Sequence, residues 1–93
     1  MKIPKTIKIG GHNFEVIIDN RNRGGSNDIG SCCHTEGKIY LEENVNQSTK
    51  ESTLFHEIIE AINYIYELDL DHNKITVLEA TLYQVLKDND LIK

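Results

Sequence analysis

The sequence predicts an α+β fold, built as a single domain of 93 residues. Two observations predict it. Residues up to about 42 show the alternating, β-branched pattern of strands, whereas residues from about 48 onward carry apolar side chains at helical spacing. The chain has room for one core, since domains cluster around roughly 100 to 150 residues. We therefore expect a mostly antiparallel sheet of about four strands over residues 5–42, packed on two C-terminal helices.

The strands are predicted in two pairs. Their expected bounds are Thr6–Ile9 with Asn13–Ile18, and Ile29–Thr35 with Lys38–Glu42. Gly10-Gly11 provides a tight turn in the first pair, and the second pair is joined near Glu36-Gly37. Residues 19–28 between the pairs are polar and rich in glycine, which is typical of a loop.

The first helix is predicted over about residues 48–67. Ser48 and Glu51 match a capping box, in which hydroxyl and carboxylate satisfy free N–H groups at a helix start. An apolar stripe follows at helical spacing and consists of Leu54, Ile58, Ala61, Ile62 and Ile65. The polar side consists of His56, Glu60, Asn63 and Glu67, with Glu57 at its edge. The apolar stripe should cover the sheet.

The second helix is predicted over about residues 73–88. Its expected buried stripe consists of Ile75, Leu78, Leu82, Val85 and Leu86. Glu79 falls inside this stripe, where an unpaired carboxylate would be costly. We therefore expect something to meet Glu79, and a metal ion held by His56 and Glu60 on the preceding antiparallel helix would do so.

Composition excludes several classes of function. The formal charge is -5 and lysines and arginines do not cluster, so a nucleic-acid partner is not expected. No stretch approaches the roughly 18 apolar residues of a membrane span, and the first five residues lack the apolar core of a signal peptide. These features predict a cytoplasmic protein without a membrane partner.

The cysteines are not expected to carry chemistry. Adjacent Cys32 and Cys33 cannot form a stabilising disulfide framework, and they lack the spacer that lets two thiolates share one zinc ion. Strand alternation should point one inward and the other outward. His12 and His34 are expected to be surface or structural residues.

The chemistry is concentrated in His56-Glu57-Ile58-Ile59-Glu60. Helical residues four apart share a face, so His56 and Glu60 can hold one metal ion together. Glu57, on the neighbouring face, would activate a metal-bound water. Glu79 on an antiparallel second helix would be the third ligand. The pattern is that of a His-Glu-x-x-His zinc-peptidase helix whose second histidine is a glutamate.

Two further residues belong to this hypothesis. His72, near the start of the second helix, could supply a nitrogen to the ion. In that arrangement Glu60 would contact the ligands without binding the ion itself. Tyr83 lies one turn beyond Glu79 and is a candidate for stabilising an oxyanion.

Residues 54–64 together with 75–80 and 82–89 resemble small phage and prophage proteins related to minimal gluzincin metallopeptidases. The segments around residues 8–16 and 37–41 are similar to the sheet of those proteins. The resemblance implies a zincin-like domain, with a twisted sheet packed on the motif helix. Carried over by position, the family's first ligand falls on His56, its catalytic glutamate on Glu57 and its third ligand on Glu79. Glu60 takes the place of its second histidine.

Two functions follow as hypotheses. The first is a metal-dependent hydrolase acting on a peptide or protein through metal-bound water. Zn²⁺ is the expected ion, and Mn²⁺ or Fe²⁺ are alternatives because Glu60 adds charge and hardness to the site. The second is a catalytically inactive zincin-fold interaction protein of phage or mobile-element origin. It would bind through its acidic surface and an exposed strand edge.

Overall fold

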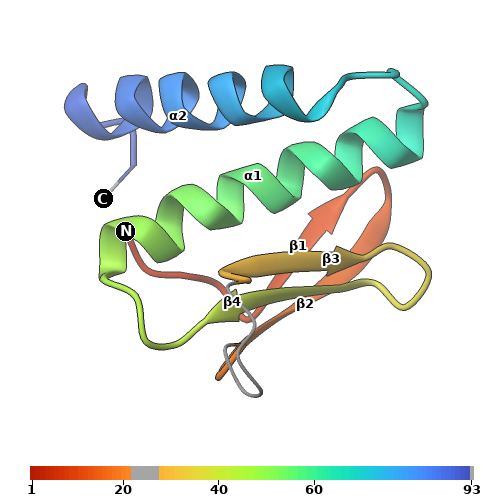
Figure 1. Cartoon of the computed structure of the whole chain (residues 1–93), viewed down its shortest axis with the longest axis horizontal. Coiled ribbons are helices and arrows are strands. Elements are labelled where there is room, and N and C mark those ends of the chain that lie inside the picture. The colour runs from red at the N-terminus through yellow and green to blue at the C-terminus, as the bar shows by residue number, and fades with distance from the viewer. Residues whose placement is uncertain (22–27, 93) are drawn as a thin grey trace.

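The computed structural model describes residues 1–21 and 28–92. Its elements follow the predicted order, with strands before helices (Figure 1). They are β1 (Thr6–Ile9), β2 (His12–Asp19), β3 (Gly30–Cys33), β4 (Lys38–Glu42), α1 (Gln47–Tyr66) and α2 (His72–Asp88). The predicted α+β fold, with a four-stranded sheet and two C-terminal helices, is confirmed. Of the predicted loop 19–28, residues 22–27 lie outside the described part of the chain.

The sheet has the strand order β1-β2-β4-β3 and is mixed. The predicted hairpins are both antiparallel pairs, β1 with β2 and β3 with β4. Positive φ angles at Gly10 and Gly11 turn the first hairpin. The two hairpins meet through a parallel pair, in which Val16 of β2 lies opposite Ile39 of β4. As a result, β3 lies at one edge of the sheet.

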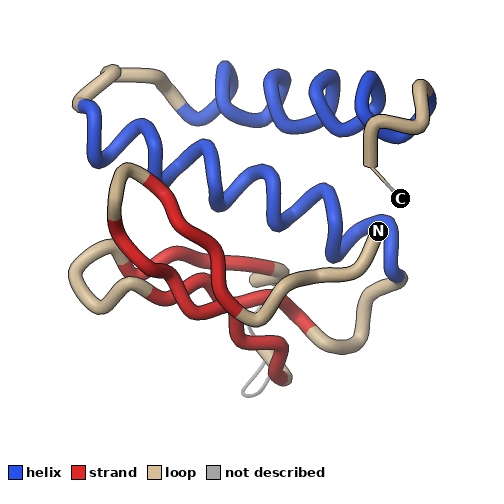
Figure 2. The backbone as a smooth tube through the Cα atoms, turned by 180° about the vertical axis from the view of Figure 1, so that it is seen from behind, coloured by secondary structure: helices blue, strands red, loops and turns tan. Residues whose placement is uncertain are grey.

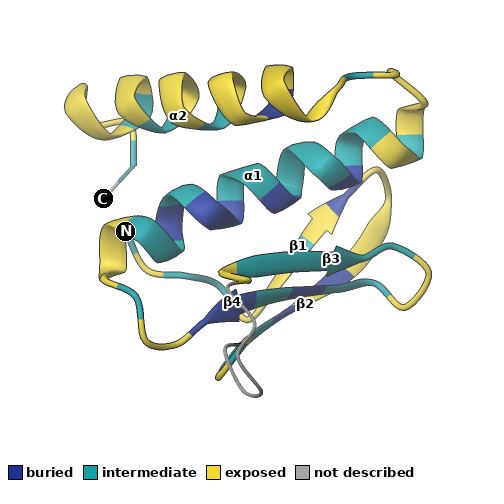
Figure 3. Cartoon of the chain, in the orientation of Figure 1, coloured by how far each residue is buried: buried dark blue, intermediate teal, exposed yellow. Residues whose placement is uncertain are grey.

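The elements stack in three layers (Figures 1 and 2). α1 covers one face of the sheet and contacts β1, β3 and β4, while α2 packs on the far side of α1. Between α1 and the sheet lies the core, formed by Ile9, Phe14, Val16, Ile39, Leu41, Leu54 and Ala61 (Figure 3). Since α2 lies on a helix that already covers the core, it buries little itself.

The capping box predicted for Ser48 and Glu51 is wrong. α1 begins at Gln47, and Asn46 is its N-cap, with a side-chain oxygen that accepts from the Thr49 N–H at 2.8 Å. The Ser48 hydroxyl donates to the same asparagine oxygen at 2.9 Å. Glu51 turns away from the helix start and lies buried against α2. An asparagine two residues earlier therefore takes the role that the Ser48 hydroxyl was expected to play.

The predicted buried stripe of α2 is only partly correct. Ile75 is buried and Leu86 is partly covered, but Leu78, Leu82 and Val85 are 43% to 45% exposed. The reason is that α2 has one neighbouring element, α1, so that only its facing side is covered. Glu79 lies on that covered side, with a side chain 19% exposed. It is shielded by the polar side of α1 rather than by an apolar stripe.

The connection between the helices is held by Asn63. Its side-chain oxygen accepts from the Leu70 N–H at 2.9 Å, and its amide donates to the Leu70 carbonyl at 3.3 Å. Glu67 ends α1 in the left-handed region, and Asp71 caps α2 by accepting from the Lys74 N–H. These bonds bring the start of α2 back over α1.

No helix in the described residues is long and apolar enough to cross a membrane.

Candidate metal centre

Three potential ligands converge between α1 and α2. His56, Glu60 and His72 each offer a ligand atom, and these atoms all lie within 4.8 Å of one another. His56 Nε2 lies 3.5 Å from a Glu60 carboxylate oxygen, as the spacing of four along one helix requires. The His72 ring approaches the His56 ring edge-on, with centroids 5.2 Å apart. The structure therefore brings together the predicted pair on α1 and the alternative ligand on α2.

This group fits a transition-metal ion by its chemistry. Two imidazoles and one carboxylate form a donor set that catalytic zinc sites use, with a further position open. Non-haem iron sites use the same set. The replacement of the motif's second histidine by Glu60 is thus balanced by His72. The cluster regains two nitrogens and one carboxylate, with the carboxylate on α1 and one imidazole on α2.

Glu79 contacts the other nitrogen of His56. Its carboxylate oxygen lies 3.4 Å from His56 Nδ1, on the side of the ring away from Glu60. The imidazole is therefore held between two carboxylates, and its side chain is 15% exposed. A carboxylate on the second nitrogen of a ligating histidine orients the ring and increases its basicity. Glu79, predicted as the third ligand, is not in the three-ligand group and contacts His56 instead.

Two adjoining hollows open onto the cluster, with volumes of about 310 and 320 Å³. Both are lined by His56, Glu57 and His72, and by Gly30 of the edge strand β3. The first extends toward Asp28 and Glu79, and the second toward Cys32, His34 and Glu60. A small molecule or an extended chain can therefore reach the ligands from the side of β3.

Glu57 faces these hollows from α1 and is only 7% exposed. Among the described residues its carboxylate has no hydrogen-bond or ion-pair partner. Burial, reinforced by the negative charges of Glu60 and Asp28, raises the pKa of Glu57 to about 7, although Arg21 opposes the shift. A carboxylate with a pKa near neutrality is suited to taking and returning a proton. The predicted position of Glu57 beside the metal ligands is therefore retained.

The space before Glu57 depends on Gly30. A Cβ atom at Gly30 would overlap the Thr53 methyl group and lie 3.2 Å from a Glu57 oxygen. Real Cβ atoms do not approach a neighbour as closely as this overlap requires, so a side chain would force β3 and Thr53 apart. Glycine thus lets the edge strand run directly against the helix at the carboxylate.

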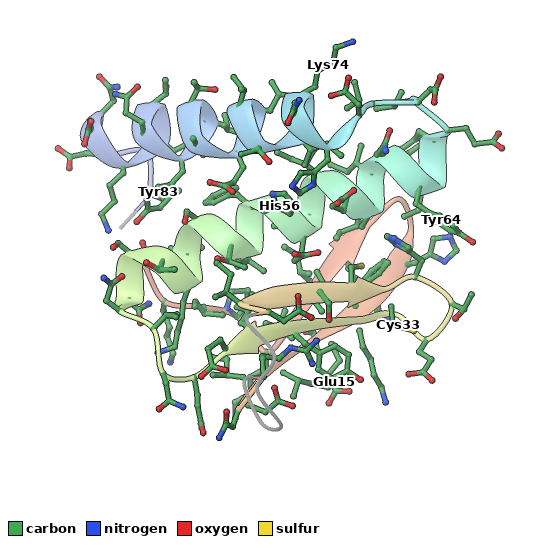
Figure 4. All side chains as sticks on the ribbon, in the orientation of Figure 1. Glu15, Cys33, His56, Tyr64, Lys74 and Tyr83 are labelled. Carbon is green, nitrogen blue, oxygen red and sulfur yellow. The ribbon has the colours of Figure 1, made fainter. Side chains whose placement is uncertain are left out.

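Tyr83 is not brought to the cluster. Its hydroxyl donates to Glu51 at 2.8 Å, and Lys87 contacts the same carboxylate oxygen at 3.1 Å. Figure 4 shows Tyr83 displaced from His56 toward the C-terminal end of α2. The oxyanion role predicted for Tyr83 has no support in this geometry, because its hydroxyl already serves the buried Glu51.

His34, expected to be a surface or structural residue rather than a ligand, lies outside the three-ligand group but lines a hollow beside it. It follows β3, lines the hollow that holds His56 and Glu60, and lies with Nδ1 3.4 Å from the Cys32 sulfur. Its ring stacks on Tyr64 with centroids 4.3 Å apart. Strand alternation is confirmed for the cysteines, because Cys32 packs against the core while the Cys33 sulfur lies by Thr35. The same alternation places Cys32 and His34 on one side of β3, a signal available in the sequence.

No family model, curated protein or solved structure matches the chain. The resemblance to minimal gluzincin proteins therefore stays a hypothesis that depends on the residues described above.

Proposed function

We propose that the protein is a metal-dependent hydrolase whose ion is held by His56, Glu60 and His72. One observation carries the proposal: the ligand atoms of these three residues, from two helices, lie within 4.8 Å of one another. Glu57 is buried, faces the same hollows and has no hydrogen-bond or ion-pair partner within residues 1–21 and 28–92, which supports a hydrolytic role over a purely structural metal site. Zn²⁺ is the expected ion, with Mn²⁺ or Fe²⁺ as alternatives for the same donors.

Each residue has a distinct part in this proposal. A bound ion supplies Lewis acidity, which polarises the carbonyl group and the attacking water. Glu57 takes a proton from that water and returns it to the leaving nitrogen. Glu79 orients His56 through Nδ1. Glu57 is only 7% exposed, and this burial strengthens its electrostatic interactions.

The position of β3 favours an extended peptide as the substrate. β3 is an edge strand, so that one side of its backbone is not paired with another described strand. An extended peptide can add to such an edge through main-chain hydrogen bonds. At Gly30 that edge passes directly before Glu57. We place this activity in the cytoplasm, where the free thiols Cys32 and Cys33 stay reduced.

Metal titration of the untagged chain, stripped with a chelator, tests the proposal. We expect one Zn²⁺ or Mn²⁺ per chain, measured by calorimetry and elemental analysis, and a higher melting temperature on binding. His72→Ala should weaken binding at least about tenfold, because it removes a nitrogen ligand. His12→Ala is the matched control, since His12 is exposed and lies outside the cluster.

Two results would reject the metal site. One is that neither Zn²⁺ nor Mn²⁺ binds stoichiometrically. The other is that the His72 and His12 variants lose metal affinity equally. His56 would then serve only to link Glu60 and Glu79 across the helices. The catalytically inactive interaction protein would remain as the alternative.

A further inference from the structure

A third hollow continues the groove along the edge strand. Its volume is about 360 Å³, and it shares His34 with the hollow that holds the metal cluster. It lies beyond the end of β3, where Gly37 takes a positive φ angle against the carbonyl of Asn13. The three hollows therefore follow β3 from Asp28 past the cluster to the turn before β4.

The walls of this third hollow are rich in rings. Tyr64, His34 and His12 contribute rings, and Ile65 and the polar residues Asn13, Thr35 and Glu36 complete the lining. Phe14 also borders the hollow but belongs to the core, at 2% exposure. Tyr64 stacks nearly parallel on His34, with an interplanar angle of 5°, and yet is 57% exposed (Figure 4). Large aromatic side chains that stay exposed on a rigid helix are typical of binding surfaces. Parallel and edge-on ring contacts favour an aromatic guest over an aliphatic one of similar size.

We propose that this hollow, bounded by His34 and Tyr64, is a specificity subsite for an aromatic side chain of the substrate. The inference rests on the proposed hydrolase function, because it assigns the same groove to one extended peptide. His34 follows Gly30 by four residues, and the strand between them rises about 3.3 Å per residue as far as Cys33. The recognised side chain is therefore about four residues away from the bond that lies before Glu57.

Binding of a small aromatic fragment tests the subsite without any hydrolysis. The probe is N-acetyl-L-phenylalanine amide, added to the isotope-labelled full chain with and without Zn²⁺. We expect saturable ring-current shifts of the Tyr64, His34 and His12 signals, and no comparable shifts with N-acetyl-L-alanine amide. Tyr64→Ala should weaken binding by about fivefold or more, because it removes one stacking wall.

Tyr66→Ala is the matched control. Tyr66 lies on the same helix end, is similarly exposed at 59%, and does not line the hollow. Equal loss in both variants, equal binding of the alanine fragment, or no shift at all would overturn the subsite. If Zn²⁺ moves the His56 and His72 signals while the aromatic probe fails, only the subsite is rejected. If Zn²⁺ leaves those signals unchanged, the proposed function fails and a substrate subsite fails with it.

Discussion

Two glutamates of α1, less than two turns apart, have opposite surroundings. Both are buried, Glu51 at 1% exposure and Glu57 at 7%. Glu51 accepts hydrogen bonds from Tyr83 and Lys87 and lies 3.5 Å from the N-terminal amine of Met1. Glu57 has no such partner among the described residues. Burial raises the pKa of both carboxyls, but at Glu51 the bonds from Tyr83 and Lys87 prevail and lower it to about 2.

Glu51 and Glu57 show that burial alone does not decide the role of a charged residue. Glu51 ties α1 to α2 and to the start of the chain, so its charge stabilises the fold. Glu57 carries the cost of desolvation without a compensating bond. The proposed catalytic role of Glu57 depends on its pKa of about 7 and on its place beside open hollows.

The largest expected effect is on hydrolysis, and it should distinguish Glu57 from Glu51. Glu57→Gln should lower the hydrolysis of fluorescein-labelled casein by about a hundredfold or more, because it removes the general base. Metal content should stay the same, since Glu57 lies outside the ligand group. Glu51→Gln should retain full turnover per folded molecule. An equal loss in both variants would remove the distinction between them.

The acid stability of the chain should depend on Glu51. Its pKa of about 2 lies below the ordinary value of 4.5, so the folded state binds this proton less tightly than the unfolded state. The stabilisation is therefore complete above pH 4.5 and disappears as the pH falls to about 2. Urea unfolding between pH 2 and 6 should show a loss on the order of 3 kcal/mol relative to Glu51→Gln. Parallel curves for the two proteins would contradict the assigned contacts.

At neutral pH, Glu51→Gln should lower the free energy of unfolding by about 2 kcal/mol. The amide keeps the shape of the side chain but loses the charge that Lys87 and the N-terminal amine face. Chemical denaturation measures this difference. Glu43→Gln is the control, because Glu43 is exposed, and it should change stability by less than about 0.5 kcal/mol. A similar loss of stability in both variants would mean that it comes from the overall charge and not from the contacts of Glu51 with Lys87 and the N-terminal amine.

The smallest expected effect concerns Tyr83, which donates a hydrogen bond to Glu51. Tyr83→Phe removes only the hydroxyl that donates a hydrogen bond to Glu51, and it should lower the free energy of unfolding by about 1 kcal/mol. Tyr66→Phe, at an exposed tyrosine, should have no measurable effect on thermal unfolding. Casein hydrolysis should be unchanged in Tyr83→Phe, and a large loss of turnover would return Tyr83 to the catalytic machinery.

Local patterns predicted the elements because they depend on neighbouring residues. Both hairpins, α1 and α2 lie within a few residues of their expected bounds. The errors arose where a choice depended on distant residues. Glu51 satisfies the spacing of a capping box, but it bonds to Tyr83, 32 residues further along the chain. Leu78 fits a buried stripe by period, yet the layer that would cover it is absent from the described residues.

The sequence by itself determined the fold class and the pairing of His56 with Glu60, because strand alternation, helical period and a spacing of four are local properties. The packing of the elements added that His72 lies beside this pair, that Glu79 contacts His56 Nδ1, and that His34 lines the same hollow. These contacts depend on how the turn held by Asn63 returns α2 over α1 and on which side β3 faces. Spacing along the chain does not encode such distances, because they arise when separate elements pack.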